Sequence, residues 1–89
     1  MDGVIIMGMS ERIEQKIREA LPVSFLDVVN ESAKHVGHAG DDGSGESHFK
    51  VVISSIALNG MPRVNAQRRI YQILEEEMGQ IHAISIKIV

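Results

Sequence analysis

The chain has 89 residues, of which 44% are hydrophobic, and it contains no cysteine. A chain of this length builds one compact domain, and a large internal active site is not expected. Without cysteine it has no disulfide bond and no thiolate ligand of its own, as in many proteins of a reducing compartment. The formal net charge of −3 gives no general attraction to phosphate backbones, so nucleic-acid binding would depend on a local basic patch.

The amino-terminal residues show no membrane or targeting signal. Residues 4–7 form an apolar run far shorter than the roughly twenty residues that a membrane span needs. The basic region and long apolar stretch that mark a signal peptide are missing from the sequence. We therefore expect a cytoplasmic protein without membrane contact, with residues 1–9 as a disordered extension and residues 10–89 as the folded domain.

The next residues predict a helix followed by a strand. Ser10 is placed to cap the helix, and Glu14 precedes Arg18 by the spacing of a helical ion pair. Apolar residues recur at helical spacing in Ile13, Ile17, Ala20 and Leu21. Pro22 ends the helix, and the β-branched and aromatic residues of 23–29 predict the first strand.

Glycine and polar residues dominate positions 30–46 and predict a loop between two strands. Residues 48–56 then alternate with period two, with Phe49, Val51 and Ile53 on one face, which predicts a second strand antiparallel to the first. A turn at 59–62 precedes a long helical pattern over 63–78, with Gly79 as its C′ residue.

A third strand is predicted by Ile84, Ile86 and Ile88, which alternate with small or polar residues. Because a strand–helix–strand connection crosses over right-handed, this strand should run parallel to the second strand in the same sheet. The predicted fold class is α+β. It is a single domain of order αββαβ, in which two helices cover one face of a mixed three-stranded sheet.

Histidines give the chain its most specific chemical feature. His35 and His38 lie in the predicted loop, His48 follows the loop, and His82 opens the last strand. Imidazole titrates near neutral pH and binds transition metals, so these side chains are candidates for metal binding.

Four segments of the chain carry a family resemblance. They are FLDVVNES at 25–32, ESHFKVV at 46–52, the Gly60 turn leading to Val64 and Ile70-Tyr71, and IHAISI at 81–86. Their residues and their order resemble the BolA family, whose fold is similar to a type II KH domain. Many members carry Arg-His where this chain has Ala66-Gln67, and the glutamine version resembles a subgroup of bacterial members.

The resemblance implies a protein partner and a shared cofactor. It implies that a monothiol glutaredoxin binds the chain and that a two-iron two-sulfur cluster lies between the two proteins, with sulfur ligands from the glutaredoxin and from glutathione. The implied histidine ligands are His82 and one loop residue. Alignment from Glu31-Ser32 favours His35 as the loop ligand, with His38 as the alternative. The isolated chain is expected to hold no cluster and to be a monomer or a weak homodimer.

Each histidine also has a purely structural interpretation. His82 is in phase with Ile84, so the pattern alone favours a buried or rim histidine bonded to the backbone. A solvated pair is the common outcome for His35 and His38, and the loop lacks two further clear ligands for a zinc site of its own. For His48, at the beginning of a strand, we expect a structural role with hydrogen bonds to the loop.

DNA binding is the alternative function, because some BolA-like proteins regulate transcription in stress response and cell morphology. Arg63, Arg68 and Arg69 of the second helix are the candidate contacts. Against it, aromatic residues for base stacking are nearly absent and no Gly-x-x-Gly clamp joins two helices. These arginines could instead be solvated. Alternatively, Arg68 and Arg69 could help to dock the glutaredoxin, opposite the acidic cluster at 75–77 that ends the same helix.

No enzymatic activity is expected. The sequence has no cysteine nucleophile, no Gly-x-Ser-x-Gly elbow, no phosphate loop and no pair of carboxylates next to a histidine on regular structure.

Overall fold

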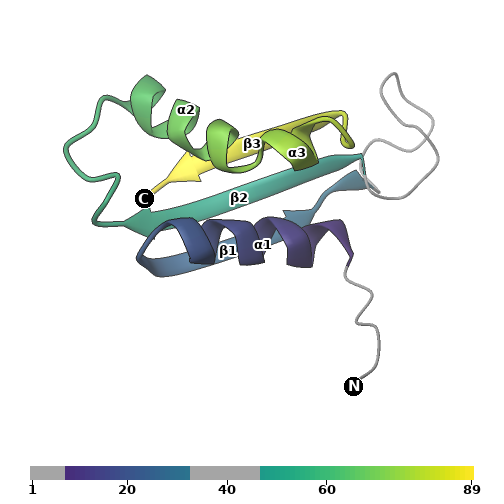
Figure 1. Cartoon of the computed structure of the whole chain (residues 1–89), viewed down its shortest axis with the longest axis horizontal. Helices are drawn as coiled ribbons and strands as arrows, with labels where there is room; N and C mark the ends of the chain where they lie inside the picture. The colour runs from purple at the N-terminus through teal and green to yellow at the C-terminus, as the bar shows by residue number, and fades with distance from the viewer. Residues whose placement is uncertain (1–7, 33–46) are drawn as a thin grey trace.

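The computed structural model describes residues 8–32 and 47–89. Over these residues the elements are α1 (Met9–Ala20), β1 (Val23–Asn30), β2 (His48–Ser55), α2 (Arg63–Ile73), α3 (Glu75–Met78) and β3 (Ala83–Ile88). β2 lies in the centre of the sheet, antiparallel to β1 and parallel to β3 (Figure 1). The predicted mixed sheet is confirmed, including the parallel pairing across the helical connection.

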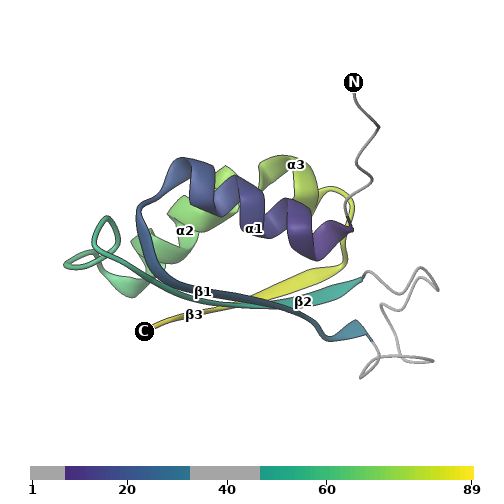
Figure 2. The same ribbon diagram turned by 90° about the horizontal axis from the view of Figure 1, so that it is seen from below.

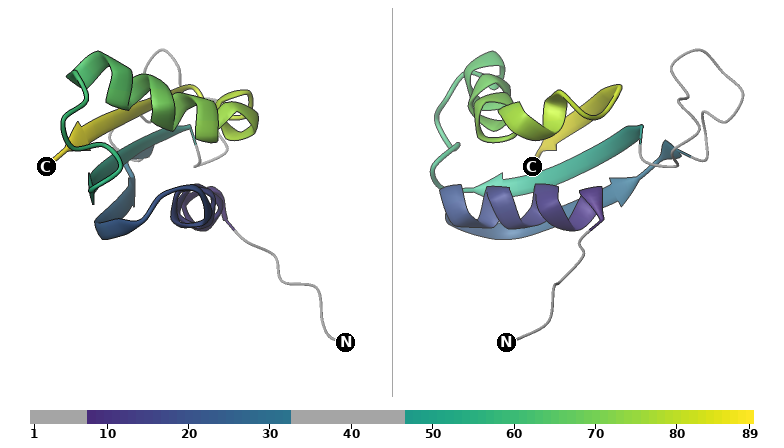
Figure 3. Two further views of the ribbon diagram at one scale, coloured as in Figure 1. Left: turned by 60° about the vertical axis from the view of Figure 1, so that its left-hand side comes forward. Right: turned by 45° about the vertical axis from the view of Figure 1, so that its right-hand side comes forward.

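Helices cover one face of this sheet, as predicted. Figure 2 shows α1, α2 and α3 on the same side of the three strands. α1 lies against β1, and α2 contacts β3, so the helices form two parts of one layer (Figure 3). The α+β class is therefore confirmed, and the opposite face of the sheet is left without a helix among the described residues.

The core lies between the sheet and the helices. On β2, Phe49, Val51 and Ile53 alternate toward the helices and are at most 2% exposed. The helices, with the residue that links α2 to α3, contribute apolar residues at helical spacing that have no exposed surface: Ile13, Ile17, Ile70 and Leu74. Burial of these side chains is the main force that holds the two layers together, because apolar surface is removed from water on both sides of the contact.

α1 begins earlier than predicted. Its N-cap is Gly8 and not Ser10, and no side chain caps the helix. Met9 is 6% exposed and packs in the core, so the helix gains apolar contact by starting at this residue. The residue thus belongs to the folded part, one position before the predicted domain boundary, while residues 1–7 lie outside the described residues. The predicted ion pair of Glu14 and Arg18 is present at 3.0 Å.

The predicted helix over 63–78 is wrong as one continuous element. Leu74 has a φ of −99° and a ψ of 19°, and this break separates α2 from α3. The glutamates at 75–77 therefore lie in the first turn of α3 and do not end α2, so their predicted place at an unfavourable helix end is also wrong. Ion pairs from Arg12 and Lys16 of α1 reach these glutamates and hold α3 in its position.

Two glycines differ in what their backbone requires. Gly60 has a φ of +85° in the turn before α2, a conformation that favours glycine. Gly79, predicted as the C′ residue of the helix over 63–78, is the C-cap of α3, and its φ of −74° is one that any residue can adopt. Among the helices of residues 8–32 and 47–89, none is long and apolar enough to cross a membrane.

Candidate functional site

The end of β1 and the start of β2 are joined by a buried group of polar residues. Ser32 Oγ accepts hydrogen bonds from the backbone N–H groups of Ser47, at 2.8 Å, and His48, at 3.1 Å. The same hydroxyl donates to the His48 carbonyl at 3.4 Å, and the Glu31 N–H donates to that carbonyl at 2.8 Å. Ser32 is 3% exposed and Ser47 is fully buried. The chain therefore leaves β1 and enters β2 at one fixed point.

His82 is attached to the same point through its backbone. The Ser47 carbonyl accepts hydrogen bonds from the N–H groups of His82, at 2.8 Å, and Ala83, at 3.1 Å. Figure 1 shows the result at the level of the elements, since β3 begins at the end of the sheet where β1 ends and β2 begins. The candidate ligand thus lies beside both ends of the segment that contains His35 and His38.

The side chain of His82 is exposed, whereas that of His48 is buried at 8% exposure. Their ring centroids are 5.1 Å apart with an interplanar angle of 47°. The ring of His48 shares a 2.9 Å hydrogen bond between Nδ1 and Ser47 Oγ. Of the two structural interpretations of His82, the core position is therefore wrong, whereas a position at the rim agrees with its exposure. The structural role expected for His48 is confirmed by its burial and its bonds to Ser32.

His35 and His38 lie outside the described residues, so their prediction as loop ligands stays a prediction. Within residues 8–32 and 47–89, no group of three or more histidine, aspartate or glutamate side chains is placed to hold a metal ion. His82 can offer an imidazole nitrogen from an accessible side chain, and borderline metals such as iron accept this donor. The donor type and the exposure of His82 fit a metal centre shared with another protein.

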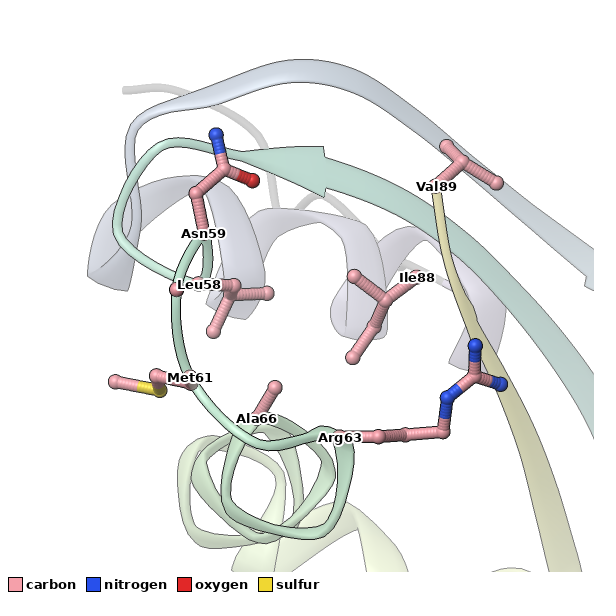
Figure 4. Close-up of a pocket in the computed structure, with 8 residues that line it drawn as sticks. Leu58, Asn59, Met61, Arg63, Ala66, Ile88 and Val89 are labelled. Atoms are coloured by element: carbon pink, nitrogen blue, oxygen red, sulfur yellow. The ribbon is translucent and has the colours of Figure 1, made fainter.

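The three predicted arginine contacts line two hollows that share Met61. Arg63 lies at the rim of a hollow of about 330 Å³, whose floor includes Leu58, Ala66 and Ile88 (Figure 4). Arg68 and Arg69 line a separate hollow of about 240 Å³ with Met61, Asn65 and Gln72. Arg68 and Arg69 therefore share one hollow as a candidate contact, and Arg63 lines the other.

The junction of α2 and α3 lacks the chemistry of a phosphate clamp. Leu74 is the linking residue and is fully buried, between Ile73 and Glu75. A KH-type clamp needs glycines whose backbone approaches the nucleic acid closely, and this junction has none. α2 and α3 are thus joined by a single leucine and not by a glycine-containing turn.

Sequence reasoning missed a buried carboxylate beside α1. Glu77 has no exposed surface, and its Oε2 lies 3.1 Å from Arg12 and 3.5 Å from Lys16. Arg12 also donates a 3.1 Å hydrogen bond to Gln80, two residues before His82. The spacing of apolar residues could have placed Glu77 on the buried side of the helix, but its charge favoured an exposed position.

Comparison with known proteins agrees with this fold. The family model described as BolA-like protein matches residues 17–89. The DNA-binding transcriptional regulator BolA of Escherichia coli is 43% identical over 81 residues, covering 90% of this chain and 73% of the relative. Among solved structures, BolA1 from Arabidopsis thaliana has a TM-score of 0.81 at 34% identity, covering 94% of this chain and 93% of that one.

A domain of a larger plant protein is equally similar. The BolA domain of SufE1 from Arabidopsis thaliana has a TM-score of 0.81 at 32% identity, with 94% of this chain and 93% of that domain's chain covered. The family match includes α2, α3 and all three strands of the sheet, and it leaves out residues 9–16, the first two thirds of α1. On these grounds the chain belongs to the BolA family.

Proposed function

We propose that this BolA-like protein is a cytoplasmic adaptor that binds a monothiol glutaredoxin and shares a bridging two-iron two-sulfur cluster with it. His82 supplies one imidazole ligand, and His35 or His38 supplies the second. The glutaredoxin and glutathione supply the sulfur ligands, because this chain has no cysteine. In this function the protein handles the cluster or senses iron, and it catalyses no reaction of its own.

Exposure of His82 at the fixed end of the sheet is the observation that carries the proposal. A ligand for a cluster shared between two proteins must be accessible from outside, and His82 is exposed while its backbone is held by Ser47. Both ends of the segment with His35 and His38 are hydrogen-bonded to each other at the same place. This arrangement supports joint ligation by His82 and a loop histidine.

Histidine ligation gives the shared cluster a distinct chemistry. Replacement of thiolate by neutral imidazole on one iron makes a cluster less negative and easier to reduce. When bound, the cluster supplies one-electron redox chemistry and is itself the cargo of a transfer. The chain's own residues hold one imidazole at the surface and orient its backbone through the Ser47 carbonyl.

The basic part of α2 supports a docking role. α2 carries Arg63, Arg68 and Arg69 and no acidic residue, although the whole chain has a net charge of −3. Arg68 and Arg69 line a shallow hollow with Met61, a residue that is 41% exposed. A partner surface with acidic residues around an apolar contact would complement this part of α2.

Cluster binding is tested by mixing the chain with cluster-loaded monothiol glutaredoxin and glutathione. We expect a new visible absorption and circular dichroism spectrum for the complex, which His82→Ala changes. His35→Ala and His38→Ala identify the loop ligand, since only one of them should change the spectrum. Ser85→Ala is the matched control, because Ser85 is exposed on β3 and is not a predicted ligand. An unchanged spectrum with His82→Ala would show that the ligand assignment is wrong.

DNA binding is the second candidate, because the Escherichia coli relative at 43% identity is named a DNA-binding transcriptional regulator. The contact would use Arg68 and Arg69, which are adjacent and exposed. A duplex complex that survives moderate salt and is lost in the double variant Arg68→Ala with Arg69→Ala would favour this function. The same variant should leave the cluster spectrum of the glutaredoxin complex unchanged in shape, since neither arginine is a ligand.

A further inference from the structure

Ser47 and His48 contact His82 in two different ways. The Ser47 carbonyl holds the backbone N–H of His82 at 2.8 Å, and the ring of His48 lies against the ring of His82 with 5.1 Å between centroids. The hydrogen bond fixes the backbone position of His82, and the ring contact limits the directions in which its side chain can point. An exposed histidine without such contacts would exchange among its side-chain rotamers on a fast timescale.

The ring of His48 is itself held in place. It is buried, and Nδ1 shares a 2.9 Å hydrogen bond with Ser47 Oγ. Ser32 Oγ in turn accepts the N–H groups of Ser47 and His48. The ring against which His82 packs is therefore held by a chain of hydrogen bonds, whereas His82 itself is an exposed residue.

From this geometry we infer that His48 and Ser47 are positioning residues, which preset the ring of His82 for ligation before the partner arrives. This inference rests on the proposed function, because it concerns the same ligand. His48 does not bind iron in this scheme. Removal of a residue that orients a metal-binding histidine typically lowers the metal affinity by about 10- to 100-fold.

Ser47→Ala separates ring orientation from backbone attachment. This variant removes the hydroxyl that holds His48 Nδ1 but keeps the carbonyl that holds His82. His48→Ala removes the ring contact altogether. If this variant does not fold, His48→Phe takes its place, because phenylalanine keeps a ring but cannot form the Nδ1 hydrogen bond. Ser55→Ala is the matched control. Ser55 is 1% exposed and donates a 2.8 Å bond to the Pro22 carbonyl at the other end of β2.

The first measurement needs no cluster. Three-bond NMR couplings of the His82 Cβ protons in the isolated protein report whether the side chain keeps one rotamer. We expect one dominant rotamer in the unmodified chain and in Ser55→Ala, and averaged couplings in Ser47→Ala and His48→Ala. Averaged couplings in the unmodified chain, or one dominant rotamer retained in His48→Ala, would overturn the inference.

The second measurement uses the complex with cluster-loaded glutaredoxin. Ser47→Ala and His48→Ala should weaken cluster-dependent binding by about tenfold or more, while Ser55→Ala leaves it unchanged. If the His82 couplings are averaged in Ser47→Ala and His48→Ala but both variants keep the cluster-dependent affinity of the unmodified chain, the positioning role is also overturned. If His82→Ala leaves cluster binding unchanged, the proposed function itself fails, and the couplings still report separately whether His48 orients the ring.

Discussion

Arg12 of α1 and Glu77 of α3 form a 3.1 Å ion pair across 65 residues of sequence, around a carboxylate that has no exposed surface. Lys16 reaches the same Oε2 at 3.5 Å, and Oε1 has no hydrogen-bond partner among the described residues. This pair fixes α3 to α1. Because Arg12 also binds Gln80, the same contacts extend to the turn that leads into His82.

Arg12→Met should destabilise the fold by roughly 3 kcal/mol, because it leaves a buried carboxylate with one remaining cation. Urea unfolding followed by far-ultraviolet circular dichroism measures the change in free energy. The matched control is Arg18→Met on the same helix, whose exposed pair with Glu14 should contribute less than about 0.5 kcal/mol. Equal losses in the two variants would show that Glu77 is hydrated and not buried.

Glu77→Met should cost less than Arg12→Met, although both variants break the same pair. Methionine fills a similar volume and removes the buried charge together with its unpartnered oxygen. The side chains of Arg12 and Lys16, left without Glu77, are 33% and 40% exposed and regain water. We expect a loss below about 1.5 kcal/mol, since an apolar group of similar volume often replaces a buried ion at little cost. A larger loss than in Arg12→Met would contradict this asymmetry.

Alkaline pH should weaken the contact between α1 and α3. The hydrogen bond with Glu76, followed by the charge of Glu77, raises the pKa of Lys16 above its ordinary value of 10.5. Because the pKa of Lys16 is higher in the folded than in the unfolded chain, the stabilisation by Lys16 is fully present below its unfolded pKa. It is lost as the pH rises through the folded pKa. The difference in urea midpoint between the unmodified chain and Lys16→Met should therefore shrink above about pH 10.5. If this difference in urea midpoint stayed constant between pH 9 and pH 12, the predicted loss of stabilisation by Lys16 at alkaline pH would be wrong.

Ser32→Ala should destabilise the fold by about 1–3 kcal/mol, because it removes the acceptor of two backbone N–H groups in a buried place. Ser24→Ala is the control, since Ser24 is exposed and its hydroxyl bonds the carbonyl and the hydroxyl of Ser54, where water can replace it. Urea unfolding gives both values. Amide hydrogen exchange at Ser47 and His48 should become faster in Ser32→Ala alone, and unchanged exchange would show that the hydroxyl does not protect these groups.

Sequence patterns predicted the sheet well, because alternation of apolar and polar residues decides which face of each strand is buried. Phe49, Val51 and Ile53 face the helices in β2, and this period fixes the pairing with both neighbouring strands. The break at Leu74 could not be predicted, because a leucine at this position fits the buried stripe whether the helix continues or stops. The start of α1 was missed because Gly8 has no side chain with which to signal a cap.

Prediction of the site depended on the family resemblance more than on the pattern. The phase with Ile84 placed His82 inward, but β3 begins at Ala83, so strand alternation does not extend to His82. The backbone of His82 does not continue the regular strand pairing, since its N–H and that of Ala83 bond the same carbonyl, that of Ser47. Ser32 and Ser47 were missed because serines next to a glycine-rich segment are common, and only the folded chain shows that they meet.

The most direct test of the central claim is hyperfine spectroscopy of the reduced complex, with ¹⁵N-labelled histidine in this chain alone. A two-iron two-sulfur cluster with one added electron is paramagnetic, and a histidine bonded to iron couples to that spin. We predict couplings from directly bonded histidine nitrogen in the unmodified complex, with one of them lost in His82→Ala and retained in Ser85→Ala. Absence of any such coupling from this chain, or an unchanged spectrum in His82→Ala, would contradict ligation by His82.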